Sequence, residues 1–418
     1  MESDSPLSVV VTMTSKPART SKPVRTSKPA RIASVDMLRG ASMIMLVLVH
    51  SVAYLARTPQ GFDPTYQFFG WVLGGTGAAL FTSLVGASFV LSMRALADLP
   101  GRVIILGAIA RGVFLIALSM CINVLTKGVD HLFVSQILQL IGVASIVVAL
   151  LRKAPSWVLL TTAVAVCAVA PLVRSALGFE EWWGGQMVVF TGAPPQGLIV
   201  VPIGELAPGI DLRAALATAL VAGVFPILPW LAFPLLGMVL GRQLAAHRPQ
   251  LGVRWTAIGG LFGIAGLGLA LYAASAGLTD VVASHLTPLA FWPDSTTMLL
   301  LQTGVVLVAM GISHAALDHH AEHGPWLDVV KLYSRYALTV YTTSWLVIFI
   351  PIHLADFLAP GRHVSDLTGT YPALAFGILL VIAYYPVLRF WDRHGGVGSM
   401  EWAMRRLQGG VGRPSTRV

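Results

Sequence analysis

The chain is 418 residues long, 56% of them are hydrophobic and only 11% are charged, and its mean hydropathy of +0.75 excludes an ordinary soluble globular protein. The formal net charge of +9 does not indicate nucleic-acid binding, because the basic residues are scattered between apolar runs. Composition therefore predicts an all-α polytopic membrane protein whose surroundings are a lipid bilayer.

The N-terminal segment, residues 1–30, contains a repeat with a period of six, TSKPAR, TSKPVR and TSKPAR from residue 14 to residue 31. Prolines and cations without an apolar run cannot form a packed element, so we expect a disordered basic tail that rests on anionic headgroups. No apolar region followed by a cleavage site precedes residue 37, which argues against a secretory signal peptide.

Apolar runs long enough to cross a bilayer follow from residue 37 onward. We predict ten spans, at roughly 37–56, 68–93, 103–125, 132–151, 156–174, 227–245, 255–276, 298–317, 334–356 and 371–391. If the N-terminus is cytoplasmic, 23 of the 28 Lys and Arg residues lie on the cytoplasmic side of the bilayer midplane, which favours this orientation and an even number of spans. Both termini are therefore expected in the cytoplasm, and the protein in the plasma membrane.

The segments outside these spans complete the predicted organisation. The largest outer loop is expected at 175–226, and within it residues 212–225 form either a short interfacial helix or a re-entrant one, which prolines separate from the next span. Residues 393–418 are expected to form a second basic cytoplasmic tail with a short interfacial helix in EWAMRRLQ. The chain then consists of a tail at 1–30, a membrane domain at 31–392 and a tail at 393–418.

The first span carries an acid, an arginine and a histidine within an apolar run, RIASVDMLRGASMIMLVLVH at 31–50. Asp36, Arg39 and His50 fall on one stripe of a helix, together with Met43 and Leu46. A rise of 1.5 Å per residue places Asp36 and His50 about 21 Å apart along the axis. Ionisable groups at membrane depth are costly, so this stripe indicates a functional site. A structural Asp–Arg pair with a hydrogen-bonded core histidine is the alternative.

Other polar side chains lie inside or beside later spans. Arg111 either extends its side chain to the interface or binds an anionic ligand, and Asn123 lies on the same predicted helix. Ser135, Gln136 and Gln139 open the fourth span, where such groups either join helices or contact a substrate.

A histidine-rich segment, AALDHHAEHGP, follows the eighth span. His314, Asp318, His319, His320 and His323 lie in it, and His319 and His323 have a spacing found in metal sites. A single cluster in a predicted cytoplasmic loop does not make a membrane metal centre, so no metal is predicted.

The chemistry that these residues permit is acyl transfer. An imidazole such as that of His50 can act as a general base or accept an acyl group itself. Guanidinium groups such as those of Arg39 and Arg111 suit a phosphate-bearing donor such as acyl-CoA, and Asp36 would hold Arg39 in position. His131 is the nearest competing histidine, at the predicted outer mouth of the fourth span. Common signatures such as a P-loop, G-x-S-x-G or H-E-x-x-H are absent from the sequence.

The sequence resembles a known family at these residues. RIASVDMLRGASMIMLVLVHS is similar to the opening helix of the heparan-α-glucosaminide N-acetyltransferase-like family, with its R-x-x-S-h-D-x-h-R-G pattern, where h is apolar. Later blocks agree in order, and the resemblance covers most of residues 31–391. They are LFTSLVGASFVLSM at 80–93, ILQLIGVASIVVALL at 137–151, PWLAFPLLGMVLGR at 229–242 and YSRYALTVYTTSWLV at 333–347.

The resemblance implies a transmembrane acyltransferase that passes an acyl group, in this family acetyl, from cytoplasmic acyl-CoA to an acceptor on the other side, using a histidine. In the lysosomal animal enzyme that histidine lies in the loop after the first helix, but residues 57–66 here contain none. Bacterial relatives carry it at the end of the helix, as His50 does. His50 and Asp36 are then catalytic, by an acyl-enzyme or a general-base route, and acyl-CoA is a co-substrate rather than a permanent cofactor.

The acceptor is expected to be a hydroxyl or amine, on a small molecule, a glycan or a lipid-linked sugar, with Asn123, Gln136 and Gln139 as its predicted ligands. The alternative function is a secondary transporter or flippase that uses the same intramembrane charges as a relay. No convincing internal repeat supports that alternative. The sequence leaves a homodimer open.

Overall fold

The computed structural model describes residues 32–57, 63–93, 99–177, 212–246, 250–276, 294–320, 323–358 and 368–410, with a few isolated residues between them. The chain divides into two units, Met1–Arg31 and Ile32–Val418, and every described helix belongs to the second. The predicted tail 1–30, residues 411–418 and most of the loop 175–226 lie outside the described residues. Within the described ranges the secondary structure is helical, with no strand, which confirms the all-α prediction.

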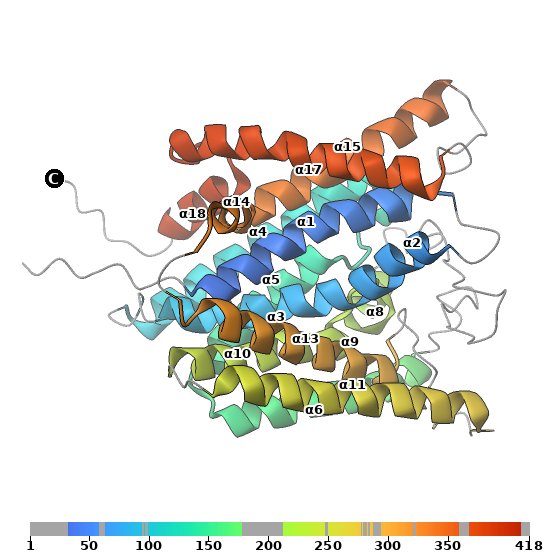
Figure 1. Cartoon of the computed structure of the whole chain (residues 1–418), viewed down its shortest axis with the longest axis vertical. Helices are drawn as coiled ribbons and strands as arrows, with labels where there is room; N and C mark the ends of the chain where they lie inside the picture. The colour runs from blue at the N-terminus through green and yellow to red at the C-terminus, as the bar shows by residue number, and fades with distance from the viewer. Residues whose placement is uncertain are drawn as a thin grey trace, which may run out of the picture. The chain divides into compact units, whose positions relative to one another are not determined.

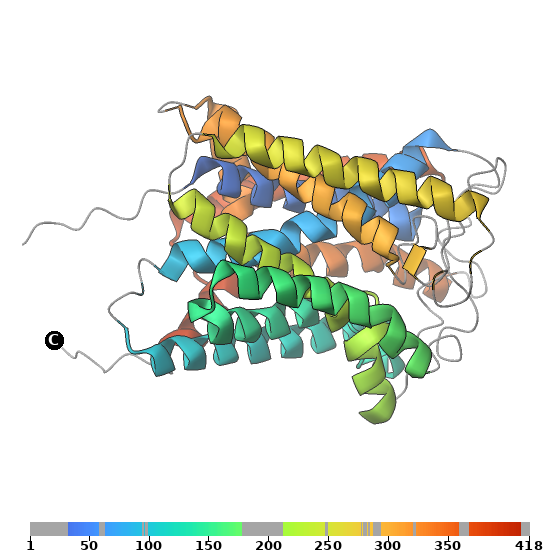
Figure 2. The same ribbon diagram turned by 90° about the horizontal axis from the view of Figure 1, so that it is seen from below.

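Nine helical stretches in the described part of the chain are long and apolar enough to cross a membrane. Each coincides with a predicted span, which confirms a polytopic membrane protein. They are α1 (Ala33–Leu55), the run Pro64–Met93 that ends in α3 (Gly74–Met93), α4 (Gly101–Lys127), α6 (Ser156–Ala176), the run Ile227–Ala245 that ends in α10 (Ala232–Ala245), α11 (Leu251–Ser275), α13 (Thr296–Leu317), α15 (Ala337–Leu358) and α17 (Thr370–Arg393). These helices run with roughly aligned axes (Figure 1) and keep this alignment in the perpendicular view (Figure 2).

The predicted span 132–151 is shorter than expected, because α5 begins only at Ile137 and ends at Leu150. The preceding residues do not continue the helix: Gln139 accepts a hydrogen bond from the backbone N–H of Gln136, which caps the helix at this point. Asn123 near the end of α4 forms a hydrogen bond with the carbonyl of Val134, and Gly101 at the start of α4 lies against Arg152. The segment 134–152, which contains α5, therefore runs antiparallel to α4 along its whole length. A tenth crossing and the orientation of the termini stay predictions.

Two short helical segments occupy residues 212–225, whose structure the sequence left open. Residues 212–225 form α8 (Leu212–Ala217) and a π-helical turn, Thr218–Ala222, too short to cross a membrane. This segment is held against the start of α5, where Phe225 N–H donates to the carbonyl of Ser135 and Ser135 Oγ donates to the carbonyl of Phe225.

The predicted span 334–356 begins later than expected, because a separate helix, α14 (Pro325–Arg335), precedes α15. Proline at its first turn suits a helix start, and Leu327, Leu332 and Tyr333 form its buried face. This helix packs so closely on α1 that a Cβ added at Gly40 would lie 2.1 Å from the carbonyl oxygen of Val330. Helix α14 thus contributes residues to the neighbourhood of the charged end of α1.

One end of the second unit, which we call the α1-start end, collects polar contacts between distant segments. Ser34 in the first turn of α1 donates its N–H and its hydroxyl to Asp318 at the end of α13, at 2.8 and 2.6 Å. Arg335 at the end of α14 pairs with Asp392 of α17. The predicted helix in EWAMRRLQ is present as α18 (Met400–Gly410), and Glu401 accepts the N–H groups of Leu338 and Thr339 at the start of α15. The bonds from Ser34 tie the start of α1 to the end of α13, and the others join α14, α15, α17 and α18.

Close packing between α3 and α10 depends on glycine. A Cβ at Gly86 would lie 1.9 Å from the carbonyl oxygen of Pro234, and a Cβ at Gly237 would lie 1.8 Å from that of Ser83. Small residues at such positions let membrane helices approach closely enough for extensive van der Waals contact. The crossing holds α3, with Ser88 on it, against the rest of the unit.

We expect Gly86→Ala to lower the stability of the folded protein by roughly 3 kcal/mol or more, because a methyl group there must push two helices apart. The matched control is Gly77→Ala in the same helix, where an added Cβ meets nothing within 4 Å. Thermal unfolding of the two purified variants in detergent measures the difference. Equal melting temperatures for both variants would contradict this account of the α3–α10 contact.

Candidate functional site

The charged stripe of α1 is held by α14. Arg39 donates from Nε to the hydroxyl and carbonyl oxygens of Ser334, at 2.8 and 3.1 Å, and from Nη2 to Asp36 at 3.0 Å. Ser334 in turn donates to the same oxygen of Asp36, at 3.2 Å. Asp36 and Ser334 are buried, and the Arg39 side chain is 26% exposed. Asp36 and Arg39 thus form an ion pair to which Ser334 is bonded on both sides.

Arg111 of α4 lies close enough to Arg39 for the two cations to interact. Its Nε atom is enclosed and has no hydrogen-bond partner among the described residues. Arg39 Nη1 also donates to the hydroxyl of Ser88 on α3, at 3.4 Å. Arg111 therefore has a donor that the described residues do not satisfy, and two neighbouring guanidinium groups are suited to a phosphate.

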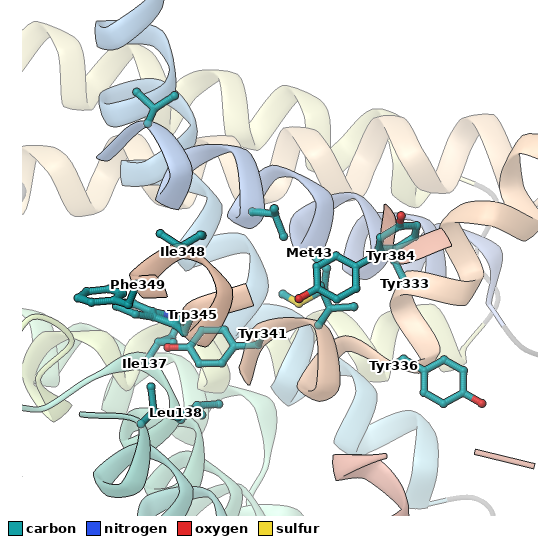
Figure 3. Close-up of a cluster of buried hydrophobic side chains, with 14 of the residues drawn as sticks. Met43, Ile137, Leu138, Tyr333, Tyr336, Tyr341, Trp345, Ile348, Phe349 and Tyr384 are labelled. Atoms are coloured by element: carbon teal, nitrogen blue, oxygen red, sulfur yellow. The ribbon is translucent and has the colours of Figure 1, made fainter. Parts of the chain in front are cut away.

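His50 lies toward the opposite end of α1, against aromatic rings of α1 and α15. The ring centroids of His50 and Trp345 are 4.7 Å apart, those of His50 and Tyr54 5.9 Å, and those of His50 and Tyr341 6.5 Å. Tyr341, Trp345 and Phe349 follow one another along α15 (Figure 3). The imidazole is partly exposed, but its Nδ1 atom is enclosed and has no hydrogen-bond partner among the described residues. A ring nitrogen without a partner can exchange a proton with a substrate.

A small pocket adjoins this aromatic group. Its walls are mainly polar and come from α4, α15 and the residue before α5: Ser119, Ile122, Asn123, Gln136, Tyr341 and Trp345. We call it the α4–α15 pocket. The space between these side chains is too narrow for a water molecule. Two of its walls, Tyr341 and Trp345, are rings that contact His50.

The three predicted acceptor ligands have different surroundings. Asn123 and Gln136 line the α4–α15 pocket, but neither forms a hydrogen bond with the ring of His50. Asn123 donates to the carbonyl of Val134 at 2.9 Å, which leaves its amide oxygen for other contacts. Gln139 caps α5 through its own amide oxygen and is not among the pocket walls, so a structural role accounts for its contacts.

Sequence reasoning missed Lys127, Tyr54 and the aromatic row of α15. The ammonium nitrogen of Lys127 lies 5.8 Å from the ring centroid of Tyr54 and 5.4 Å from that of Trp345. Helical spacing could have indicated two of these residues, because Tyr54 lies one turn after His50 and Lys127 lies one turn after Asn123. The competing histidine, His131, lies in the short helix Val129–His131 and is partly buried.

A second buried polar cluster was also missed, at the end of α6 and the start of α13. Arg174 donates from Nη1 to the backbone carbonyl of Asp294 at 3.0 Å, and Gln302 donates to the Asp294 carboxyl group at 3.1 Å and to the carbonyl of Gly75 at 2.9 Å. Burial raises the pKa of Asp294 to about 7, although Arg174 and the hydrogen bond from Gln302 oppose the shift. The cluster ties three helices together.

The histidine-rich segment is linked to the start of α1 by hydrogen bonds. His314 Nδ1 bonds to Asp318 at 2.7 Å, and Asp318 receives the two bonds from Ser34. His323 bonds to the carbonyl of Leu317 at 2.9 Å. Within the described residues, no group of three or more His, Cys, Asp or Glu side chains could hold a metal ion.

Fold and site together define an all-α multi-pass membrane protein in which one helix carries an Asp–Arg pair at one end and a histidine toward the other. A comparison with protein families matches residues 31–273 to the family described as heparan-alpha-glucosaminide N-acetyltransferase, catalytic. The match covers more than half of the chain, and the protein belongs to this family. No curated protein matches the chain in a sequence search. The match ends before α13, whereas the resemblance was expected to extend over most of 31–391.

Proposed function

We propose that this protein transfers an acyl group, acetyl in the simplest case, from acyl-CoA to an acceptor hydroxyl or amine through His50. Family membership supports a membrane acetyltransferase, since the family description names an N-acetyltransferase. The observation that carries the proposal is the arrangement along α1, where the Asp36–Arg39 pair and His50 share one continuous helix. Along its axis His50 lies about 21 Å from Asp36 and about 17 Å from Arg39. The arginines would hold the phosphates of the donor, and the pantetheine arm would extend toward His50.

The acceptor would enter the α4–α15 pocket, whose walls carry hydroxyl, amide and indole groups. These groups form hydrogen bonds with sugar hydroxyls, and aromatic rings provide flat apolar surfaces beside them. A sugar or glycoconjugate therefore remains the proposed acceptor. The donor would bind from the cytoplasm and the acceptor from the other side of the plasma membrane.

Turnover of acyl-CoA by the purified protein tests this proposal. We expect release of free coenzyme A in nanodiscs, and faster release when a sugar acceptor is added. The same protein in proteoliposomes should use acyl-CoA supplied at one face only. A protein that releases no coenzyme A under any of these conditions, yet moves a solute across the vesicle membrane, would replace the proposal by the transporter alternative.

A further inference from the structure

Lys127 brings a positive charge next to the candidate catalytic histidine. Its ammonium nitrogen is enclosed and has no hydrogen-bond partner among the described residues. It is held over the faces of Tyr54 and Trp345, at 5.8 and 5.4 Å from the ring centroids, which is within the range of a cation–π interaction. Both rings also contact His50. A group that reacts at His50 therefore meets the field of this cation.

An enclosed cation affects hydroxyl and amine acceptors differently. A hydroxyl group is neutral at physiological pH, whereas an ordinary primary amine is protonated and carries a positive charge. Repulsion between two cations is much stronger in a protein interior than in water. An amine would therefore have to lose its proton before it could approach His50, whereas a hydroxyl group could approach in its ordinary neutral form.

The surroundings offer little to offset this repulsion. The side chains that line the α4–α15 pocket are neutral, so no carboxylate among the pocket walls would attract an ammonium group. The faces of Tyr54 and Trp345, which could bind a cationic acceptor, already hold Lys127. Hydroxyl and amide groups of the pocket, such as those of Ser119 and Asn123, suit neutral polar acceptors.

We propose that Lys127 makes the site selective for hydroxyl acceptors, so that the protein catalyses O-acylation rather than N-acylation. The inference rests on the proposed acyl transfer and departs from the N-acetyl transfer in the family description. In the reaction the C–S bond of the thioester breaks and a C–O bond to the acceptor forms. The hydroxyl proton passes to His50 and then to the departing thiolate, which leaves as free coenzyme A.

Matched acceptor pairs test this selectivity. Purified protein is given acetyl-CoA with ethylene glycol or ethanolamine, and with glucose or glucosamine; ester and amide products are separated by the lability of esters to hydroxylamine. The wild-type protein should form mainly esters. Lys127→Gln should raise the ratio of amide to ester at least tenfold, whereas Lys127→Arg should keep the wild-type ratio. Arg57→Gln removes an exposed cation that follows α1 and should leave the ratio unchanged.

The outcomes separate the two hypotheses. Amide formation by the wild-type protein as fast as ester formation, or an unchanged ratio in Lys127→Gln, would overturn the selectivity and leave acyl transfer standing. Transfer to no member of either pair, with no release of coenzyme A, would overturn both. Size-exclusion profiles and acetyl-CoA binding of the Lys127 variants show that they remain folded. If Lys127→Gln does not fold, an amide-to-ester ratio in Lys127→Arg that differs from wild type would contradict the inference.

Discussion

Replacing His50 with alanine is expected to abolish acyl transfer while the protein remains folded and still binds acyl-CoA. The imidazole lies against Trp345 in the aromatic row of α15, and its Nδ1 atom has no hydrogen-bond partner within the described residues. Loss of a general base costs about 10²- to 10⁴-fold in rate, and loss of an acyl-accepting nucleophile costs more. Transfer rates with saturating acetyl-CoA, measured beside acetyl-CoA affinity, test this expectation.

Two further variants test whether a loss of activity in His50→Ala is due to the loss of this imidazole. His50→Gln keeps a side chain of similar size against Trp345, so a loss of activity there cannot come from a cavity alone. His131→Gln alters the competing histidine in the short helix after α4 and should retain transfer. Wild-type transfer in His50→Ala, or a complete loss in His131→Gln alone, would move the reaction to His131.

A covalent intermediate separates the two routes that remain for His50. If the histidine accepts the acyl group, wild-type protein mixed with radiolabelled acetyl-CoA without acceptor should retain label after denaturation, and His50→Gln should retain none. If His50 acts only as a base, neither protein retains label. Both results keep His50 in the reaction and differ only in the number of chemical steps.

The stripe on α1 could be predicted because it depends only on local periodicity. Steps of three and four residues place Asp36, Arg39 and His50 on one face of any helix that forms there, and the structure contains that helix. The nine candidate spans in the described part of the chain could be predicted for a similar reason, since length and hydropathy are properties of a single segment.

The partners of the stripe could not be predicted, because they come from segments far away in the sequence. Ser334, which fixes Arg39, is 295 residues away and lies on α14, an amphipathic helix without a long apolar run. Lys127 and Trp345 lie on different helices, and only tertiary packing brings them to His50. The late start of the helix in the predicted span 132–151 has a local cause, since the side chain of Gln139 turns back to cap the start of its own helix.

Part of this site lies outside the region that matches the family. Residues 31–273 contain Arg39, His50 and Arg111, whereas Ser334 and Trp345 follow it. The chain's last helices thus complete a site whose charged residues belong to the matched region.

Replacing Arg39 with alanine is expected to weaken acyl-CoA binding by roughly tenfold to hundredfold, which corresponds to about 1.5–3 kcal/mol for a lost charge-assisted hydrogen bond. Arg39→Lys keeps the charge but loses the forked geometry, and should bind with intermediate affinity. Asp36→Asn should have a smaller effect, because Ser334 still orients the guanidinium group. Arg39→Ala leaves Asp36 without its cation, so we also expect a lower melting temperature. Acyl-CoA affinity is measured by equilibrium binding, and desulfo or dephospho analogues of coenzyme A show which end of the donor is lost. An unchanged affinity in a folded Arg39→Ala protein would exclude Arg39 from the donor site and leave Arg111 as its remaining candidate.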